Sequence, residues 1–453
     1  MLDPTLILNP VQAHQLDGLL KMVHQLTGDS ISGWHQSLAE EVHSATNRIE
    51  RLMISNSQQT LTQELVQTFS QRQQVILNTL VPPLKALEKL VLSGHLNDAS
   101  KAKLLIQLGR TYELLTQWDL AIDQFYQALD YCKDDLVEKA TVLKSIGRIK
   151  SKQRDFGEAH KQYQASLAIY QELEDSYQVA QLYINIGFNH FQSDNYSAAE
   201  ENYNKALLLA QSTADAERLV ADVSMNLGIL ATVKGDQNSA FSYYERSIEV
   251  YTEIDDERGL SYAYHNMAML CVDFKLWQKA GTFYQKSLEY ARRLTNLHLM
   301  GHVYLNYTEL ALKLSDLELA QACCMHAIKT FGRIGAQAQL GDALKFAGIT
   351  QHRKKNFDKA DLFFRRSIQM AVECESKLNQ AEAQYEYALH LLEKQKPDKT
   401  KAENQLNEAM KIFTELDAKV DIANTQAALD RIAESQKATA PTSRFIRINR
   451  DMV

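Results

Sequence analysis

The chain has 453 residues, 45% of them hydrophobic, which is enough for two or three domains or for one elongated array. A formal net charge of -7 disfavours binding to nucleic acid or to an anionic membrane surface, so the expected partners are proteins or peptides. Five cysteines without a CxxC pair argue against a disulfide framework or a zinc site, and no signal-peptide pattern or long apolar run occurs, so we expect a cytoplasmic protein without a membrane span.

Residues 1–95 form the predicted N-terminal part of the chain. Apolar residues recur there at helical spacing, which predicts helices near residues 10–27, 33–53 and 57–92. The clearest run consists of Leu16, Leu19, Leu20, Val23 and Leu26. Three roles are open for these helices: a small bundle, a cap on the part that follows, or the interface of a homodimer.

From residue 98 onwards the chain repeats itself. No proline occurs between residues 84 and 396, so this whole stretch can be helical. An alanine follows a small anchor residue by twelve positions in seven repeats and by fourteen in the eighth, where an insertion surrounds Pro397. The anchors are 38 to 41 residues apart, at Gly109, Gly147, Gly187, Gly228, Ala268, Thr308, Gly348 and Ala388.

Each repeat adds a bulky and a small residue to this pattern. Four residues beyond the alanine stands an aromatic residue or leucine, except in the sixth repeat, which has Cys324 there. Three residues further on stands alanine or serine in all eight repeats. Small residues let two helices approach closely, and the bulky residue fills the space between them.

This pattern resembles the tetratricopeptide repeat (TPR) signature and extends over residues 98–416. The spacing near 40 residues and the missing helix-ending proline are similar to the long-helix TPR proteins, which include kinesin light chains and Rap-type peptide-responsive regulators. The resemblance implies an all-α, right-handed superhelical solenoid of about eight helix pairs, whose concave groove is lined mainly by the first helices. Residues 417–436 are expected to form a capping helix and residues 437–453 a flexible basic tail.

One stripe of the first helices is expected to line this groove. Two residues before the anchor, four successive repeats carry asparagine, a row that we call the asparagine row: Asn185, Asn226, Asn266 and Asn306. A side-chain amide can donate to and accept from a peptide backbone at once, so the row could hold an extended peptide whatever its sequence. The long-helix TPR proteins grip peptides with groove asparagines in a similar way. The alternative is that these amides hydrogen-bond between neighbouring first helices.

The remaining predicted groove residues surround this row. Its mixed, partly apolar lining is expected from Phe188, Ile229, Tyr262, His265, Met269, His302 and Glu309. The first two repeats add a basic end, with Arg110, Lys144, Arg148 and Lys152, while the eighth adds Glu382, Glu386 and Glu393. If this polarity is functional, a ligand lies with its acidic end toward the first repeats. The basic tail is an alternative occupant of the acidic end.

The common catalytic motifs are absent. No Walker loop, GxGxxG, GxSxG or HExxH sequence occurs, so we predict no catalytic residue, metal or cofactor. We expect a scaffold or adaptor that binds an extended peptide or partner segment in the groove. The alternative, implied by the Rap resemblance, is a peptide-switched regulator whose N-terminal helices act on a response regulator, with phosphatase-like activity through a glutamine between Gln58 and Gln74.

Overall fold

The computed structural model describes residues 18–19, 22, 78, 81–82, 84–89, 91–92, 96–132, 135–394 and 396–439. The three helices predicted in residues 1–95 lie mostly outside these residues, and the tail after residue 439 lies wholly outside them. The chain divides into two compact parts, Met1–Val303 and Tyr304–Val453, which are described separately.

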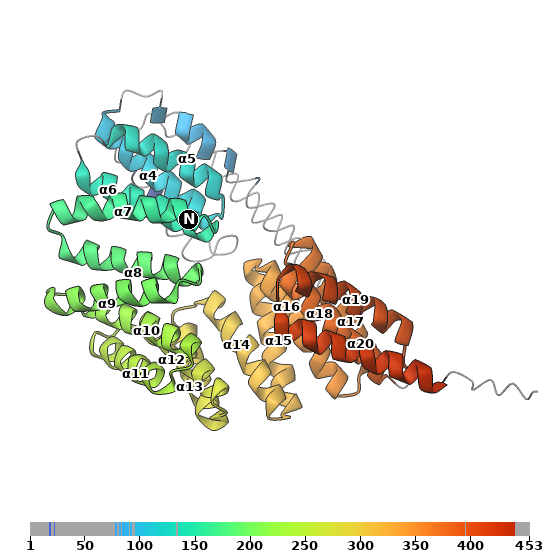
Figure 1. Ribbon diagram of the computed structural model, residues 1–453. Helices are drawn as coiled ribbons and strands as arrows, with labels where there is room; N and C mark the ends of the chain where they lie inside the picture. Colours follow the sequence, from blue (N-terminus) through green and yellow to red (C-terminus); the bar gives the residue numbers. More distant parts are fainter. Residues whose placement is uncertain are drawn as a thin grey trace, which may run out of the picture. The chain divides into compact units, whose positions relative to one another are not determined.

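The described residues form helices that follow one another in pairs (Figure 1). The first part contains α4 (Asp98–Leu114), α5 (Trp118–Tyr131), α6 (Leu136–Lys152), α7 (Phe156–Glu172), α8 (Ser176–Gln192), α9 (Tyr196–Ser212), α10 (Glu217–Lys234), α11 (Gln237–Glu253), α12 (Glu257–Asp273) and α13 (Trp277–Arg293). Helix α14 (Leu297–Lys313) contains the division between the parts. The second part continues with α15 (Leu317–Ile334), α16 (Gln337–Arg353), α17 (Phe357–Glu373), α18 (Lys377–Glu393), α19 (Lys399–Glu415) and α20 (Lys419–Thr439). The predicted all-α architecture is confirmed.

The turns between helices follow from local sequence. Aspartate or asparagine precedes many of the helices, and its carboxylate or amide oxygen accepts a hydrogen bond from the backbone N–H three residues on, as Asp155 does from Glu158. Most of the turns contain one residue with a left-handed backbone, such as Asp194 with φ of 58°. Among the described residues, glycine takes this conformation in two turns, at Gly235 and Gly335. These turns reverse the chain without the proline that the usual TPR helix end carries.

The anchor residues let paired helices touch. A Cβ added to Gly187 would lie 2.7 Å from the ring of Tyr203, and one added to Gly147 would lie 2.8 Å from the ring of Tyr163. The bulky residue of each of these repeats therefore packs directly on the glycine, as the sequence predicts. The small serine has a second role that the sequence does not reveal. The Ser166 hydroxyl donates to the Ala140 carbonyl at 2.7 Å, across the helix pair.

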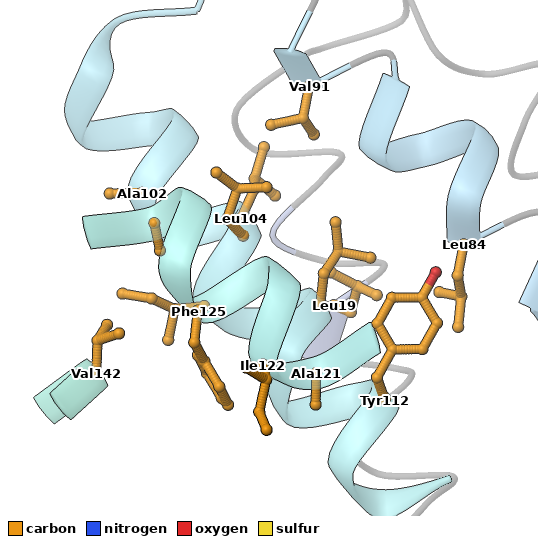
Figure 2. Close-up of a cluster of buried hydrophobic side chains, with 14 of the residues drawn as sticks. Leu19, Leu84, Val91, Ala102, Leu104, Tyr112, Ala121, Ile122, Phe125 and Val142 are labelled. Carbon is orange, nitrogen blue, oxygen red and sulfur yellow. The ribbon is translucent and has the colours of Figure 1, made fainter. Parts of the chain in front are cut away.

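Buried side chains close both ends of the described array. Leu19, Leu84 and Val91, from the N-terminal part, lie in one apolar cluster with Leu104 and Tyr112 of α4 (Figure 2). In the second part, α20 buries Ala428 and Ile432 against a cluster shared with α18 and α19. The described N-terminal residues thus cover the first repeat, which favours a cap among the three roles left open, and α20 covers the last repeat. The division into the predicted domains stays a prediction.

Candidate functional site

The asparagine row lies on the first helices of successive repeats. In the first part of the chain, α8, α10 and α12 carry Asn185, Asn226 and Asn266 at the same repeat position, and α10 contacts both α8 and α12. All three side chains are half-buried. Asn306 is also half-buried, on the portion of α14 that belongs to the second part. The sequence placed each of the four on the first helix of its repeat, and this placement agrees with the structure.

The first three amides have no partner among the described residues. The structure records no hydrogen bond from the side chains of Asn185, Asn226 or Asn266 to any of them. The interhelical bonding that the sequence left as an alternative therefore gains no support at these positions. A half-buried amide keeps both its donor and its acceptor capacity, which a peptide backbone can satisfy.

Apolar side chains accompany the asparagines. Phe188 is 46% exposed and Met269 is 43% exposed, which is high for such large apolar residues. Ile229 and Tyr262 are half-buried. The Tyr262 hydroxyl accepts a hydrogen bond from the Asn296 amide at 3.2 Å, so this tyrosine is held in place. These residues can offer contact area to a ligand without having to leave the core.

His265 does not lie on an exposed groove lining, contrary to what the sequence had led us to expect. It is 8% exposed, and its ring centroid lies 6.0 Å from that of Tyr284. Burial, with a smaller contribution from His302, lowers the pKa of His265 to about 4. Tyr284 belongs to α13, the second helix of the same repeat. His265 is therefore a packing residue.

His302 and Glu309, the last two residues of the predicted lining, each contact a side chain on their own helix. The His302 ring lies 4.8 Å from the His298 ring, one helical turn away, and His302 is half-buried. In the second part of the chain, the Glu309 carboxylate pairs with the Lys313 ammonium at 2.9 Å. Both groups are partly exposed, so this i,i+4 pair contributes little to stability and leaves Glu309 accessible.

The predicted basic end contains a carboxylate that the sequence analysis overlooked. Glu113 of α4 pairs with Arg148 at 2.7 Å and with Lys152 at 2.9 Å, both from α6. Burial alone would raise the pKa of Glu113, but the two cations lower it below its usual value. Glu113 was detectable, because it lies on the first helix one residue before a stripe position. Its effect is to neutralise part of the predicted positive charge.

Two cations of the basic end form no ion pair with a described residue. Arg110 is half-buried, and burial together with the Arg148 charge lowers its pKa. Lys144 donates to the side-chain oxygens of Gln178 at 2.7 Å and Gln181 at 2.8 Å. Burial, followed by Arg148 and Arg110, lowers the pKa of Lys144 to about 8. Crowded, partly desolvated cations of this kind favour an anionic group beside them.

The predicted acidic end, in the second part of the chain, is also partly engaged. The Glu393 carboxylate lies 2.9 Å from His352 Nε2, and His352 Nδ1 lies 3.0 Å from His390 Nδ1. His390 Nε2 in turn lies 3.2 Å from Asp361, which Lys394 approaches to 2.6 Å. These contacts join α16, α17 and α18.

The other two acidic residues differ from each other. Glu382 pairs with the buried Lys345. Burial raises the pKa of Glu386, which forms no ion pair with a described residue. The acidic end therefore offers less free negative charge than its sequence suggests.

The described residues contain no group of three or more His, Cys, Asp or Glu side chains placed to hold a metal ion. Among the same residues, no helix is both long and apolar enough to cross a membrane. The vicinal cysteines Cys323 and Cys324 are buried, and burial raises their pKa values to about 11 and about 12. They are packing residues in their protonated form.

A family model built from known proteins matches part of the repeats. The family model described as tetratricopeptide repeat matches residues 100–172 and 178–253, which contain the first four helix pairs. Residues 100–172 and 178–253 therefore carry tetratricopeptide repeats. The helix pairs after residue 253 keep the order of anchor, alanine and small residue through α19, with two extra residues between anchor and alanine in the last pair.

Solved structures share this fold at low sequence identity. A signal transduction ATPase with a TPR sensor from Pyrococcus horikoshii is 14% identical, over 86% of this chain and 64% of that one, with a TM-score of 0.53. The apo quorum sensor NprR from B. thuringiensis is 17% identical, over 77% and 99%, with a TM-score of 0.52. Aspartyl phosphate phosphatase F from Bacillus subtilis is 18% identical, over 76% and 93%, with a TM-score of 0.50. At these identities the likeness establishes the fold alone.

Proposed function

We propose that the chain is a protein–protein interaction scaffold whose first helices bind an extended peptide or partner segment. The observation that carries the proposal is the row of half-buried amides at Asn185, Asn226 and Asn266, which have no partner among the described residues. One amide per repeat matches the regular backbone of an extended chain. The TPR fold supports this use, because stacked repeats present long surfaces for partner segments.

The spacing of the repeats suggests the length of the bound segment. Neighbouring packed helices lie about 8–10 Å apart, so the first three amides span about 18 Å. An extended chain advances about 3.3 Å per residue, so about six residues contact these three amides. Each hydrogen bond contributes about 0.5–1.5 kcal/mol, so the amides alone give weak binding. The partly exposed Phe188 and Met269 are then expected to supply selectivity.

Arg110 of α4 and Lys144 of α6 are expected to fix the direction in which the ligand lies. Arg110 and Lys144 form no ion pair with a described residue, whereas Glu113 already engages Arg148 and Lys152. An acidic end of the ligand is therefore expected beside Arg110 and Lys144. Attraction of this kind mainly increases the association rate and fixes the orientation, and it weakens as salt concentration rises.

The experiment begins with peptides selected from a random displayed library against the full chain. Their affinities are then measured by fluorescence anisotropy for the wild type and for the variant N185A/N226A/N266A. A loss of at least about tenfold supports the proposal. The matched control, N204A/N238A, removes exposed asparagines on α9 and α11 and should bind as the wild type does. Equal affinity for all three proteins would contradict the proposal.

A second candidate is a peptide-switched signalling regulator whose N-terminal helices act on a response regulator. The fold likeness to a quorum sensor and to an aspartyl phosphate phosphatase favours keeping this candidate. Loss of label from a phosphorylated response regulator, with and without a selected peptide, tests it directly. Sedimentation of the full chain tests the associated proposal that the N-terminal helices form a homodimer.

A further inference from the structure

A cleft lies between the second helices of the fourth and fifth repeats. It has a volume of about 460 Å³ and is lined by α11, α12 and α13. Its apolar walls are Phe241 and Ile248 of α11 and Phe283 of α13, and Tyr264 and Met267 of α12 complete its lining. None of these five residues belongs to the asparagine row or to the predicted groove lining. The cleft is therefore distinct from the surface of the proposed function.

Helix pairs of this chain also form without aromatic side chains at the positions of Phe241 and Phe283, which in their own repeats pack partly against the buried cluster around Tyr244 and Met267. The repeat position of Phe283 holds Gln124, Gln162 and Asn202 in the first three repeats, and those repeats form the same helix pairs. The position of Phe241 holds His160 and Glu200 in the two preceding repeats. Phe241 and Phe283 are both only half-buried. Aromatic surface at positions that tolerate amides and charges is typical of recognition.

Opposite charges border the cleft on its two sides. Glu245 and Glu249 stand four residues apart on the exposed face of α11. Lys279 and Lys286 stand seven residues apart on α13, so both again share one helical face. None of the four forms an ion pair with a described residue. The Lys286 ammonium lies 4.9 Å from the centroid of the Tyr264 ring, and therefore stands over the cleft.

We propose that this cleft binds an amphipathic helix of a partner protein, with apolar residues in the cleft, basic residues along α11 and acidic residues along α13. An apolar floor between two charged rows matches a helix that carries opposite charges on the two flanks of its apolar face. The seven-residue spacing of the lysines corresponds to two helical turns, about 10 Å, which an occupant helix can follow over the same length. A single small molecule would not need charge rows of this extent.

The test uses three helical peptides of about 18 residues with one shared apolar face, built from Leu and Phe at i, i+3, i+4 and i+7. The mixed peptide carries Arg on one flank and Glu on the other, and the two others carry only Glu or only Arg. Because a helix can lie in either direction, the mixed peptide can match the rows in one of them. The full-length chain is expected to bind the mixed peptide about tenfold more tightly than either of the others, by fluorescence anisotropy.

Two variants make the test specific. In E245K/E249K both rows are basic, so the preference should change to the all-Glu peptide. The control E172K/E174K makes the same charge change on exposed residues of another repeat and should keep the wild-type preference. F283Q, which installs the residue of the first two repeats, should weaken binding of the mixed peptide about tenfold. N185A/N226A/N266A should bind it as the wild type does, so the proposed function and this inference fail separately.

Three results would overturn the proposal. The first is equal binding, or no binding, of the three peptides to the wild type. The second is an unchanged preference in E245K/E249K. The third is undiminished binding of a mixed peptide whose helix is broken by a central proline, since the occupant would then not be a helix.

Discussion

Buried His265 makes the free energy of unfolding of this chain depend on pH. Burial lowers the pKa of His265 to about 4, whereas an unfolded histidine titrates near pH 6.5. Below about pH 6.5 the unfolded chain therefore binds a proton that the folded chain does not bind, so the free energy of unfolding falls as pH falls. This stabilising contribution is complete above about pH 6.5 and is lost progressively toward pH 4.

We predict that H265Q reduces the pH dependence of thermal unfolding between pH 6.5 and 5, while His390, whose pKa is also lowered to about 4, keeps a comparable part of it. The difference from the wild type over this window should be about 1–2 kcal/mol. Substitution of the exposed His326 by glutamine is the control and should leave the wild-type slope unchanged. A wild-type slope in H265Q would show that His265 titrates normally in the folded chain.

Lys144 gives a second prediction, for binding. Its pKa is lowered to about 8, so it loses its positive charge as pH rises from 7 to 9. A selected peptide with an acidic end should therefore bind several-fold more weakly at pH 9 than at pH 7. K144Q should bind more weakly at pH 7 and show little further change. A peptide without acidic residues should show no such dependence, and the same pH dependence in K144Q would contradict the role of Lys144.

The environment of a side chain can be predicted from the sequence more reliably when its own helix alone determines that environment. Asn185 could be placed on the outer stripe because helical periodicity alone sets its direction. The burial of His265 could not be predicted in this way, because it packs against Tyr284 of a different helix, α13. The pairing of Glu113 with Arg148 has the same origin, since its two members come from different repeats.

At the scale of the helix pair, an anchor glycine lets the two helices approach closely. A Cβ at Gly187 would lie 2.7 Å from the Tyr203 ring and 3.2 Å from the Ala199 carbonyl oxygen, so G187A must displace the ring or separate α8 from α9. We expect it to cost about 1–3 kcal/mol, despite the better helix propensity of alanine. G157A, where nothing lies within 4 Å, is the matched control and should be neutral or stabilising. The thermal unfolding midpoints of G187A and G157A are compared with that of the wild type. Equal midpoints would contradict this packing.

The helix pairs were the most predictable elements. Their anchors, alanines and aromatic residues occur at fixed offsets, and eight repetitions of one pattern leave little ambiguity about helix and turn. The cleft between α11 and α13 was not predicted. It is lined by Phe241 and Phe283, which lie 42 positions apart in the sequence and come to line one cleft only when two repeats stack.

At the scale of the molecule, stability in stacked repeats passes between neighbours. Leu87 is fully buried in the cluster that covers α4 and α5. L87A should remove about 2–5 kcal/mol of local stability and reduce hydrogen-exchange protection in these two helices. Protection of α18, α19 and α20 should stay unchanged. L92A is the control, because Leu92 is 38% exposed, and equal loss of protection in all helices would show that the array unfolds as one unit.

The central proposal is that the asparagine row recognises a peptide backbone. The most direct test is a double-mutant cycle between N185A and a selected peptide in which single backbone amides are replaced, one at a time, by esters. We predict that one ester position is coupled to Asn185 by about 0.5–1.5 kcal/mol, and that a position about three residues away is coupled in the same way to Asn226. Coupling energies near zero at every position, with a peptide that still binds the wild type, would contradict backbone recognition by the asparagine row.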